Sequence, residues 1–134
     1  MSQENVEIVR RSYAAVNRVI VSGDLAPFLL EFYDPGVEYA PVEEGSVVRG
    51  HEQFGEYFRR FLEVWEEFCW ELEEVIDAGD SIVSAANMKG RASASGIEIT
   101  QRVFHVADIR GSKIARLREY LDRQEALKAA GLSE

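Results

Sequence analysis

The spacing of apolar residues along this chain changes most clearly near residue 68, and the change limits the folds that the chain can adopt. Before that point apolar residues recur every three or four positions, as on a helix buried along one face. The clearest run comprises Phe54, Tyr57, Phe58, Phe61, Leu62 and Trp65. Beyond it, Phe68, Trp70 and Leu72 alternate with polar side chains, as on a strand with one buried face. Helices followed by strands predict an α+β fold, with the helices packed on one face of a strongly curved sheet.

Helical spacing predicts three helices in the first half of the chain. The first runs from residue 2 to about residue 21, and Gly23 provides its stop. Asp24 is expected to cap a second, shorter helix, which ends before the helix-breaking residues Tyr33-Asp-Pro-Gly. The third helix follows Gly50 and extends through the aromatic run to Trp65.

The remaining segments are predicted to be strands. Residues 37–42 form a short edge strand, because Pro41 has no amide hydrogen to donate, and residues 43–45 form an exposed loop. Four longer strands are expected from residue 68 to a turn at 78–80, and at 81–91, 97–109 and 114–121. Their short connections favour an antiparallel meander. Asp122 can accept from the amide of Glu125 and so begin a short C-terminal helix.

The length of 134 residues is that of one domain, and no run of proline, serine or glycine divides the chain. We therefore expect residues 1–134 to form a single domain around one core. The apolar runs are much shorter than the ~20 residues of a membrane-spanning helix, and the first residues lack the segments of a secretion signal. A cytoplasmic location is expected.

Charge and composition argue against several classes of partner. The net charge of −9 repels phosphates and anionic lipids, so neither nucleic acid nor membrane is expected to bind. With one cysteine, two histidines and no glycine-rich phosphate loop, the chain is expected to hold no metal and no cofactor. Cys69, between Phe68 and Trp70, is expected to be a packed thiol.

Several short motifs are distinctive in combination. They are Asn5-Val-Glu-Ile-Val-Arg-Arg, Asp34-Pro-Gly-Val-Glu-Tyr, Arg49-Gly-His-Glu, Ile76-Asp-Ala-Gly-Asp, Phe104-His-Val, Gly111-Ser-Lys-Ile and Arg118-Glu-Tyr-Leu-Asp-Arg-Gln-Glu-Ala-Leu. With these motifs the chain resembles, from about residue 3 to residue 132, the SnoaL-like branch of the nuclear transport factor 2-like and ketosteroid isomerase-like superfamily.

The resemblance implies a cone-shaped, curved mixed sheet wrapped around three N-terminal helices, which is an α+β roll of the cystatin type. It also implies a pocket between helices and sheet, and a homodimer through the outer face of the sheet. Relatives include isomerases, cyclases, epoxide hydrolases, dehydratases and proteins without catalysis. Membership therefore implies the shape of the molecule and leaves the reaction open.

Alternation along the last strand assigns its side chains to two faces. One set comprises Ala115, Leu117, Glu119 and Leu121, and the other comprises Ile114, Arg116, Arg118 and Tyr120. Because the first set is apolar except for one carboxylate, we expect it to face the pocket. Burial among apolar side chains is then expected to raise the pKa of Glu119, while a protonated His105 nearby would lower it again.

The resemblance supplies roles for three residues. Glu119 lies where cyclases and epoxide hydrolases of the superfamily carry a catalytic aspartate, and His105 matches a pocket histidine of the cyclases. Tyr13, on the apolar stripe of the first helix, matches the oxyanion-donating tyrosine of ketosteroid isomerases. The predicted catalytic set is therefore Glu119, His105 and Tyr13. Two alternatives need no catalysis: Glu119 pairs with His105 or an arginine as a satisfied polar group, and Tyr13 packs in the core.

A second group of residues is expected to form the walls of the pocket and bind the substrate. It comprises Phe32, Tyr39, Phe61, Trp65, Asn87, Met88, Leu117 and Leu121. Asn87 is the one polar side chain in its stretch that could orient a water molecule. Such a lining suits a small apolar or aromatic organic molecule, unless the side chains fill the cone completely.

Two well-defined reactions of the superfamily fit this chain poorly. No carboxylate stands at Tyr39-Ala-Pro or at Phe104, where the isomerases carry theirs, and Ser84-Ala-Ala-Asn-Met lacks the arginine and aspartate of the epoxide hydrolases. Three functions stay open: an acid and base isomerase or polyketide-cyclase-like enzyme acting on an apolar cyclic substrate, a ligand-binding domain without catalysis, and a dimerisation module.

Overall fold

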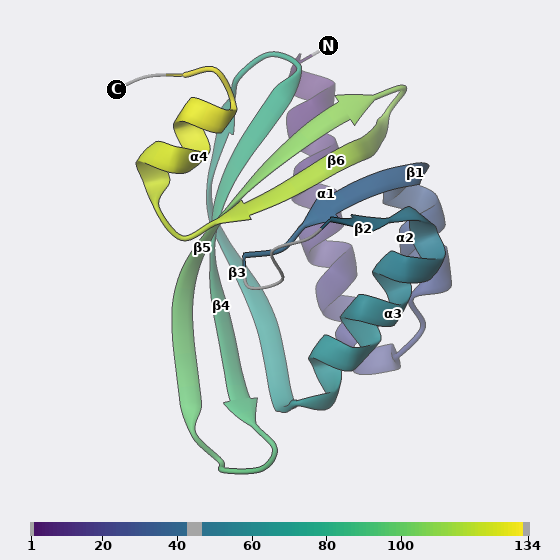
Figure 1. Ribbon diagram of the computed structural model, residues 1–134, viewed down its shortest axis with the longest axis vertical. Coiled ribbons are helices and arrows are strands. Elements are labelled where there is room, and N and C mark those ends of the chain that lie inside the picture. The colour runs from purple at the N-terminus through teal and green to yellow at the C-terminus, as the bar shows by residue number, and fades with distance from the viewer. Residues whose placement is uncertain (1, 43–46, 133–134) are drawn as a thin grey trace.

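A computed structural model describes residues 2–42 and 47–132. Its elements are α1 (Ser2–Ser22), α2 (Ala26–Phe32), β1 (Tyr33–Ala40), β2 (Val48–Arg49), α3 (Gly50–Glu63), β3 (Trp65–Asp77), β4 (Ser81–Ala92), β5 (Glu98–Arg110), β6 (Lys113–Tyr120) and α4 (Arg123–Ala129). The six strands form one mixed sheet in the order β2-β1-β6-β5-β4-β3, and it curves around α1, α2 and α3 (Figure 1). The predicted α+β cone is confirmed. No helix in the described ranges is long and apolar enough to cross a membrane.

The long elements follow the apolar periodicity closely. α1, α3 and the antiparallel meander β3-β4-β5-β6 lie where they were predicted, and Asp122 accepts from the Glu125 amide at the start of α4. The predicted cap of α2 is wrong. Leu25 holds that position without a side-chain hydrogen bond, and the Asp24 amide donates to Ser22 Oγ instead.

The strand after α2 differs from the prediction in two respects. β1 begins at Tyr33, because the pairing with β6 shifts between Tyr33 and Glu38 and so accommodates Pro35 within the strand. It is also not an edge strand, since the two-residue β2, which was not predicted, pairs on its other side. The predicted loop at residues 43–45 lies outside the described residues.

Trp65 is the first residue of β3 and does not belong to α3. Its ring lies directly on Gly90 of β4, where an added Cβ would come 2.5 Å from the ring. The aromatic spacing of α3 continues into this strand, because the Trp65 ring packs beside Phe61 of α3, with ring centroids 6.0 Å apart. Spacing alone therefore extended the predicted helix by two residues.

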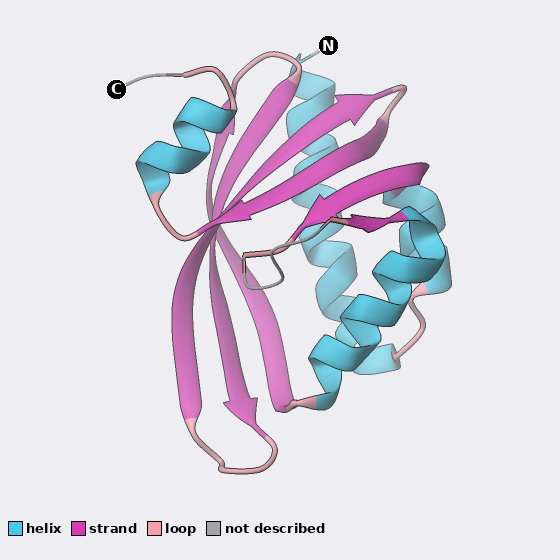
Figure 2. Cartoon of the chain, in the orientation of Figure 1, coloured by secondary structure: helices cyan, strands magenta, loops and turns pink. Residues whose placement is uncertain are grey.

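The sheet carries apolar clusters on both faces, so the expectation of one core is wrong. The larger cluster lies between the sheet and α1, α2 and α3. A smaller one lies on the outer face, where Ala126 and Leu127 of α4 pack on Val83, Phe104 and Val106. Figure 2 shows α4 on the side of the sheet opposite the other helices. α4 thus covers the most apolar part of the outer face.

The rest of the outer face is polar. Ion pairs connect its strands, with Lys89 Nζ 3.0 Å from Glu71 and Arg102 Nη1 2.5 Å from Glu73. Cys69 lies on the edge strand β3, where it pairs with Lys89 of β4, and it is exposed on this face. The expectation of a packed thiol is therefore wrong, because Cys69 alternates with Trp70, which points inward.

One side chain ties α1 to the sheet. The Asn17 amide donates to the Trp70 carbonyl at 2.8 Å, and the Trp70 amide donates back to Asn17 Oδ1 at 2.9 Å. Both peptide groups of this edge-strand residue are thus paired by a helix. The contact also determines where the preceding turn of α1, which contains Tyr13, lies over the sheet.

Replacing Asn17→Ala is expected to lower the free energy of unfolding by about 1–3 kcal/mol, because two peptide groups lose their partner. Arg18→Ala is the matched control, since Arg18 is the exposed next residue of α1, and it should change stability by less than about 0.5 kcal/mol. Urea unfolding of the two variants measures both values. Equal effects would show that the Asn17 contact contributes nothing specific.

Candidate functional site

A cavity of about 310 Å³ lies between the helices and the concave face of the sheet. This volume is at the lower end of the range for ligand pockets. Of the predicted wall residues, Tyr39, Phe61, Met88, Leu117 and Leu121 line it. The interior is therefore not completely filled by side chains in the described part of the chain.

Three predicted wall residues lie elsewhere. Phe32 is buried against Phe28, with ring centroids 5.7 Å apart. Trp65 packs on Gly90, as described above. Asn87 pairs in register with Glu71 and Arg102 on the outer face, because its neighbour Met88 points into the cavity. The expectation that these three line the cavity is wrong, and Asn87 cannot orient water there.

Three polar residues of the cavity form one row across the sheet. Ser84 of β4 pairs with His105 of β5, and His105 pairs with Glu119 of β6. Since neighbouring positions of paired strands project to the same face, all three side chains point into the cavity. Ser84 was not predicted as a site residue, because the register between strands cannot be read from the spacing within one strand.

The predicted inward set of β6 is correct only for its C-terminal half. Leu117, Glu119 and Leu121 line the cavity, but Ile114 takes the place expected for Ala115. Arg116 pairs with Asp108 while Ile114 pairs with Ile109, so Ala115 is the extra residue of a β-bulge. The bulge reverses the alternation, and Ala115 lines a hollow outside the cavity.

The predicted catalytic residues are connected by hydrogen bonds. Tyr13 Oη lies 2.5 Å from His105 Nδ1 and 2.7 Å from Ser84 Oγ. His105 Nε2 lies 3.0 Å from Glu119 Oε2. Glu119, His105 and Tyr13 therefore lie together in the wall of the cavity, and Ser84 completes the chain. Their catalytic role stays a prediction.

Glu119 accepts further hydrogen bonds from β1 and the residues after it. Tyr39 Oη donates to Oε2 at 2.6 Å, and the Val42 amide donates to Oε1 at 3.2 Å. Burial alone would raise the pKa of Glu119, but His105, Tyr39 and Val42 together outweigh it and hold that pKa below its ordinary value. The expected rise of this pKa is therefore wrong, and Glu119 is ionised at neutral pH.

The phenols around this carboxylate stay protonated. Burial, and then the negative charge of Glu119, raise the pKa of Tyr33 and of Tyr39 above the ordinary value. Burial likewise raises the pKa of Tyr13, although the hydrogen bond with Ser84 opposes the shift. These phenols can thus act as hydrogen-bond donors and not as bases.

The Trp70 indole packs against the His105 imidazole. The Trp70 ring meets His105 edge to face, with centroids 5.1 Å apart, and Tyr13 in the same manner at 6.3 Å. Trp70 lines the cavity and was not predicted as a site residue, although its inward position in the alternation of β3 was the available signal. His105 therefore has one orientation set by three neighbours.

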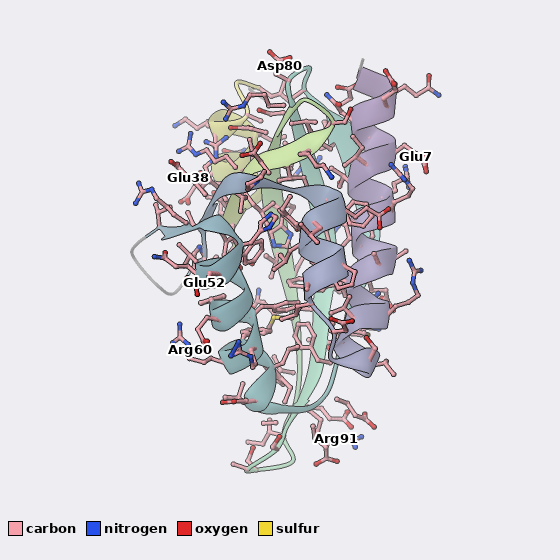
Figure 3. All side chains as sticks on the ribbon, turned by 90° about the vertical axis from the view of Figure 1, so that its right-hand side faces the viewer. Glu7, Glu38, Glu52, Arg60, Asp80 and Arg91 are labelled. Atoms are coloured by element: carbon pink, nitrogen blue, oxygen red, sulfur yellow. The ribbon has the colours of Figure 1, made fainter. Side chains whose placement is uncertain are left out.

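Glu119 is the only acidic side chain among the described residues that line the cavity. Figure 3 shows Glu7, Glu52 and Arg60 pointing outward from the helices. Among the described residues, no lysine or arginine lines the cavity, and no three histidine, cysteine or acidic side chains cluster as metal ligands do. The polar groups of the cavity can exchange protons and hydrogen bonds with a neutral molecule.

A family model for the SnoaL-like domain matches residues 9–117. The chain belongs to the SnoaL-like domain family. No curated protein matches it. The Burkholderia pseudomallei NTF2-like protein of unknown function is similar in structure to this SnoaL-like domain, with a TM-score of 0.77 at 24% identity over 96% of this chain and 97% of that chain.

Two further solved structures share the fold. A putative SnoaL-like polyketide cyclase from Jannaschia sp. has a TM-score of 0.77 at 17% identity, covering 100% of this SnoaL-like domain and 96% of its own chain. TerC, co-crystallised with polyporic acid, has a TM-score of 0.74 at 22% identity, covering 96% and 98%. At these identities the likeness establishes the fold alone.

The lowered pKa of Glu119 predicts how the stability of this SnoaL-like domain changes with pH. The unfolded chain binds the proton more readily than the folded chain, so the carboxylate stabilises the fold above the ordinary carboxyl range. That contribution is lost as pH falls through the folded pKa. Glu119→Gln should therefore lower the free energy of unfolding at pH 7, by about 1–3 kcal/mol, and by less below about pH 4.

Urea unfolding at several pH values measures this difference. Glu38→Gln is the control, since the Glu38 side chain is 45% exposed and its ion pair with Arg49 spans 3.6 Å. It should show little difference from the parent at any pH. A deficit of Glu119→Gln that is the same at every pH would contradict the assigned ionisation.

Proposed function

We propose that this domain binds a small apolar cyclic molecule that contains a carbonyl group, and that Glu119 takes a proton from a carbon beside that carbonyl. The observation that supports the proposal is the position of a buried, ionised carboxylate in the wall of a largely apolar cavity. Oε2 accepts from two donors but Oε1 accepts only from the Val42 amide among the described residues. A carboxylate oxygen with a spare lone pair can receive a proton.

The lowered pKa restricts the reaction. A carboxylate with a pKa below its ordinary value is a weak base, so transfer from an unactivated carbon would be slow. The carbon must therefore be acidified, for example by a position between a carbonyl and an aromatic ring. In the step proposed, the C–H bond breaks, the proton goes to Glu119 Oε1, and the electron pair forms an enolate. Returning the proton to another carbon completes an isomerisation.

Two of the three named structures are consistent with a cyclic ligand. One was co-crystallised with polyporic acid, and the other is described as a putative SnoaL-like polyketide cyclase. The aromatic lining of Tyr39, Phe61 and Trp70 offers flat surfaces for rings. We therefore favour a polyketide-cyclase-like or isomerase activity over a purely structural role.

Ligand binding without catalysis is the second candidate. It is favoured by the three hydrogen bonds that Glu119 accepts, because they satisfy a buried carboxylate without any reaction. Under this alternative, Glu119→Gln binds ligand about as well as the parent and no turnover exists to lose. The following experiment separates the two.

Exchange of hydrogen for deuterium at C1 of 2-tetralone tests the proposal. This bicyclic ketone has an acidified C1 between its carbonyl and its aromatic ring, and it needs no further reactant. The parent is expected to accelerate the exchange, and Glu119→Gln to reduce the acceleration roughly 100-fold or more, as loss of a general base does. Proton NMR in deuterium oxide follows the C1 signal.

Glu38→Gln serves again as the control and should exchange C1 at the rate of the parent. Binding of 2-tetralone is measured alongside through tryptophan fluorescence, since Trp70, one of the two tryptophans, lines the cavity. Binding without accelerated exchange would reject catalysis on this ketone in favour of the second candidate.

A homodimer through the outer face of the sheet is also part of the proposal. Since α4 covers the most apolar part of that face, the shared surface would be the polar region around Cys69 and Lys89. Dimerisation there is expected to protect Cys69 from alkylation by iodoacetamide, increasingly so at higher protein concentration. A rate that does not depend on concentration, together with a monomeric mass by light scattering, would contradict it.

A further inference from the structure

The hydrogen-bond chain of the site has a direction that begins at Glu119. As an ionised carboxylate with three donors around it, Glu119 can only accept, so His105 Nε2 must carry a proton toward Oε2. This holds whether the imidazole is neutral or charged. The charge of His105 is therefore decided at the other ring nitrogen, Nδ1, which faces Tyr13.

When His105 is neutral, Nδ1 is a lone pair and needs a donor. Tyr13 Oη, at 2.5 Å, supplies its only proton to that nitrogen. Ser84 must then donate its own proton to Tyr13 Oη, at 2.7 Å, for that contact to be a hydrogen bond. Both hydroxyl protons are used within the chain. Toward a ligand, Ser84 and Tyr13 then offer only acceptor lone pairs.

When His105 is protonated, the direction reverses. Nδ1 now donates to Tyr13 Oη, and the phenol proton is free to turn away. It either points into the cavity directly or donates to Ser84 Oγ, which then turns its own proton toward the cavity. In both arrangements the pair gains one hydrogen-bond donor for a ligand. One proton on the imidazole thus converts an acceptor site into a donor site.

We propose that Tyr13 and Ser84 form a proton-gated ligand site, which receives a carbonyl oxygen when His105 is protonated and a hydroxyl group when His105 is neutral. The proposal rests on the proposed function for the location of the ligand, and adds which chemical group of the ligand Tyr13 and Ser84 select. It also implies that ketone binding takes up a proton. A keto form and its enol would thereby be favoured at opposite charge states of the same site.

The groups that face His105 come from four elements of the fold. Glu119 faces it from β6, Tyr13 from α1, Ser84 from β4 and the uncharged Trp70 ring from β3. Tyr33 and Tyr39 on β1 and Tyr57 on α3 also line the cavity, and the phenols of the first two stay protonated. Apart from His105 and the phenols, Glu119 is the only described lining residue with an ionisable side chain.

Two ligands with the same carbon frame test the proposal. 2-Tetralone presents a carbonyl oxygen and 2-naphthol presents a hydroxyl group at the equivalent position. Their dissociation constants are measured at about pH 5, where proton uptake is favoured, and at about pH 8, where it is disfavoured. The preference for 2-tetralone over 2-naphthol should be roughly 5–10-fold greater at the lower pH, which is the worth of one exchanged hydrogen bond.

Tyr13→Phe is expected to make that preference independent of pH, because it removes the hydroxyl that reverses and keeps the ring. Ser12→Ala is the matched control on the same helix, since Ser12 also lines the cavity but donates its proton to the Val9 carbonyl at 2.7 Å. It should retain the pH dependence of the parent.

A preference that is equal at both pH values in the parent would overturn the proposal. So would a pH dependence retained in Tyr13→Phe, since the charge of His105 would then act without the hydroxyl chain. Failure of the parent to bind either compound would overturn both this proposal and the proposed function. Accelerated exchange of 2-tetralone without a pH-dependent preference rejects this proposal alone, and the reverse result rejects catalysis alone.

Discussion

The carboxylate of Glu119, buried to 11% exposure, is the group to which most of the site responds. Removing an ionised carboxylate from water costs several kcal/mol unless donors replace the water. The fold supplies them from three segments that are far apart in the sequence, with His105 on β5, Tyr39 on β1 and Val42 beyond β1. The parallel pairing of β1 with β6, which places Tyr39 beside Leu117, makes this possible. The sheet order is thus what allows the charge to be buried.

This requirement extends from the sheet to the helices. Once His105 donates from Nε2 to Glu119, its other nitrogen is left in the core and needs a partner as well. Tyr13 provides it from α1, and the Asn17 contacts with Trp70, one turn later, hold the helix at the correct height. Without Tyr13, the Nδ1 nitrogen of His105 would lack this hydrogen-bond partner. Helix placement and site chemistry therefore have one cause.

Much of this architecture could be predicted from the sequence because it depends on periodicity, which is a local property. The helices, the meander and the inward face of Glu119 all follow from spacing within one segment. Asn87 was misplaced for a local reason, since it and its neighbour Met88 project to opposite faces of one strand. Ala115 was misplaced and Ser84 was missed because a bulge and the register between strands depend on pairing across segments. The sign of the Glu119 pKa shift was wrong for the same reason, since Tyr39 and Val42 reach the carboxylate only in the folded chain.

The same hydrogen bonds that make Glu119 tolerable in the core also make it a weaker base. Each donor stabilises the ionised form of Glu119. The same hydrogen bond therefore stabilises the fold and lowers the tendency of Glu119 to accept a proton. A site built in this way favours ligands whose protons are already acidic, and it discriminates among them by hydrogen bonding more than by basicity. The neutral phenols and the reversible His105 chain are suited to that discrimination, since they respond to where a ligand carries its own proton. In this domain, stability and selectivity are thus two results of one set of contacts.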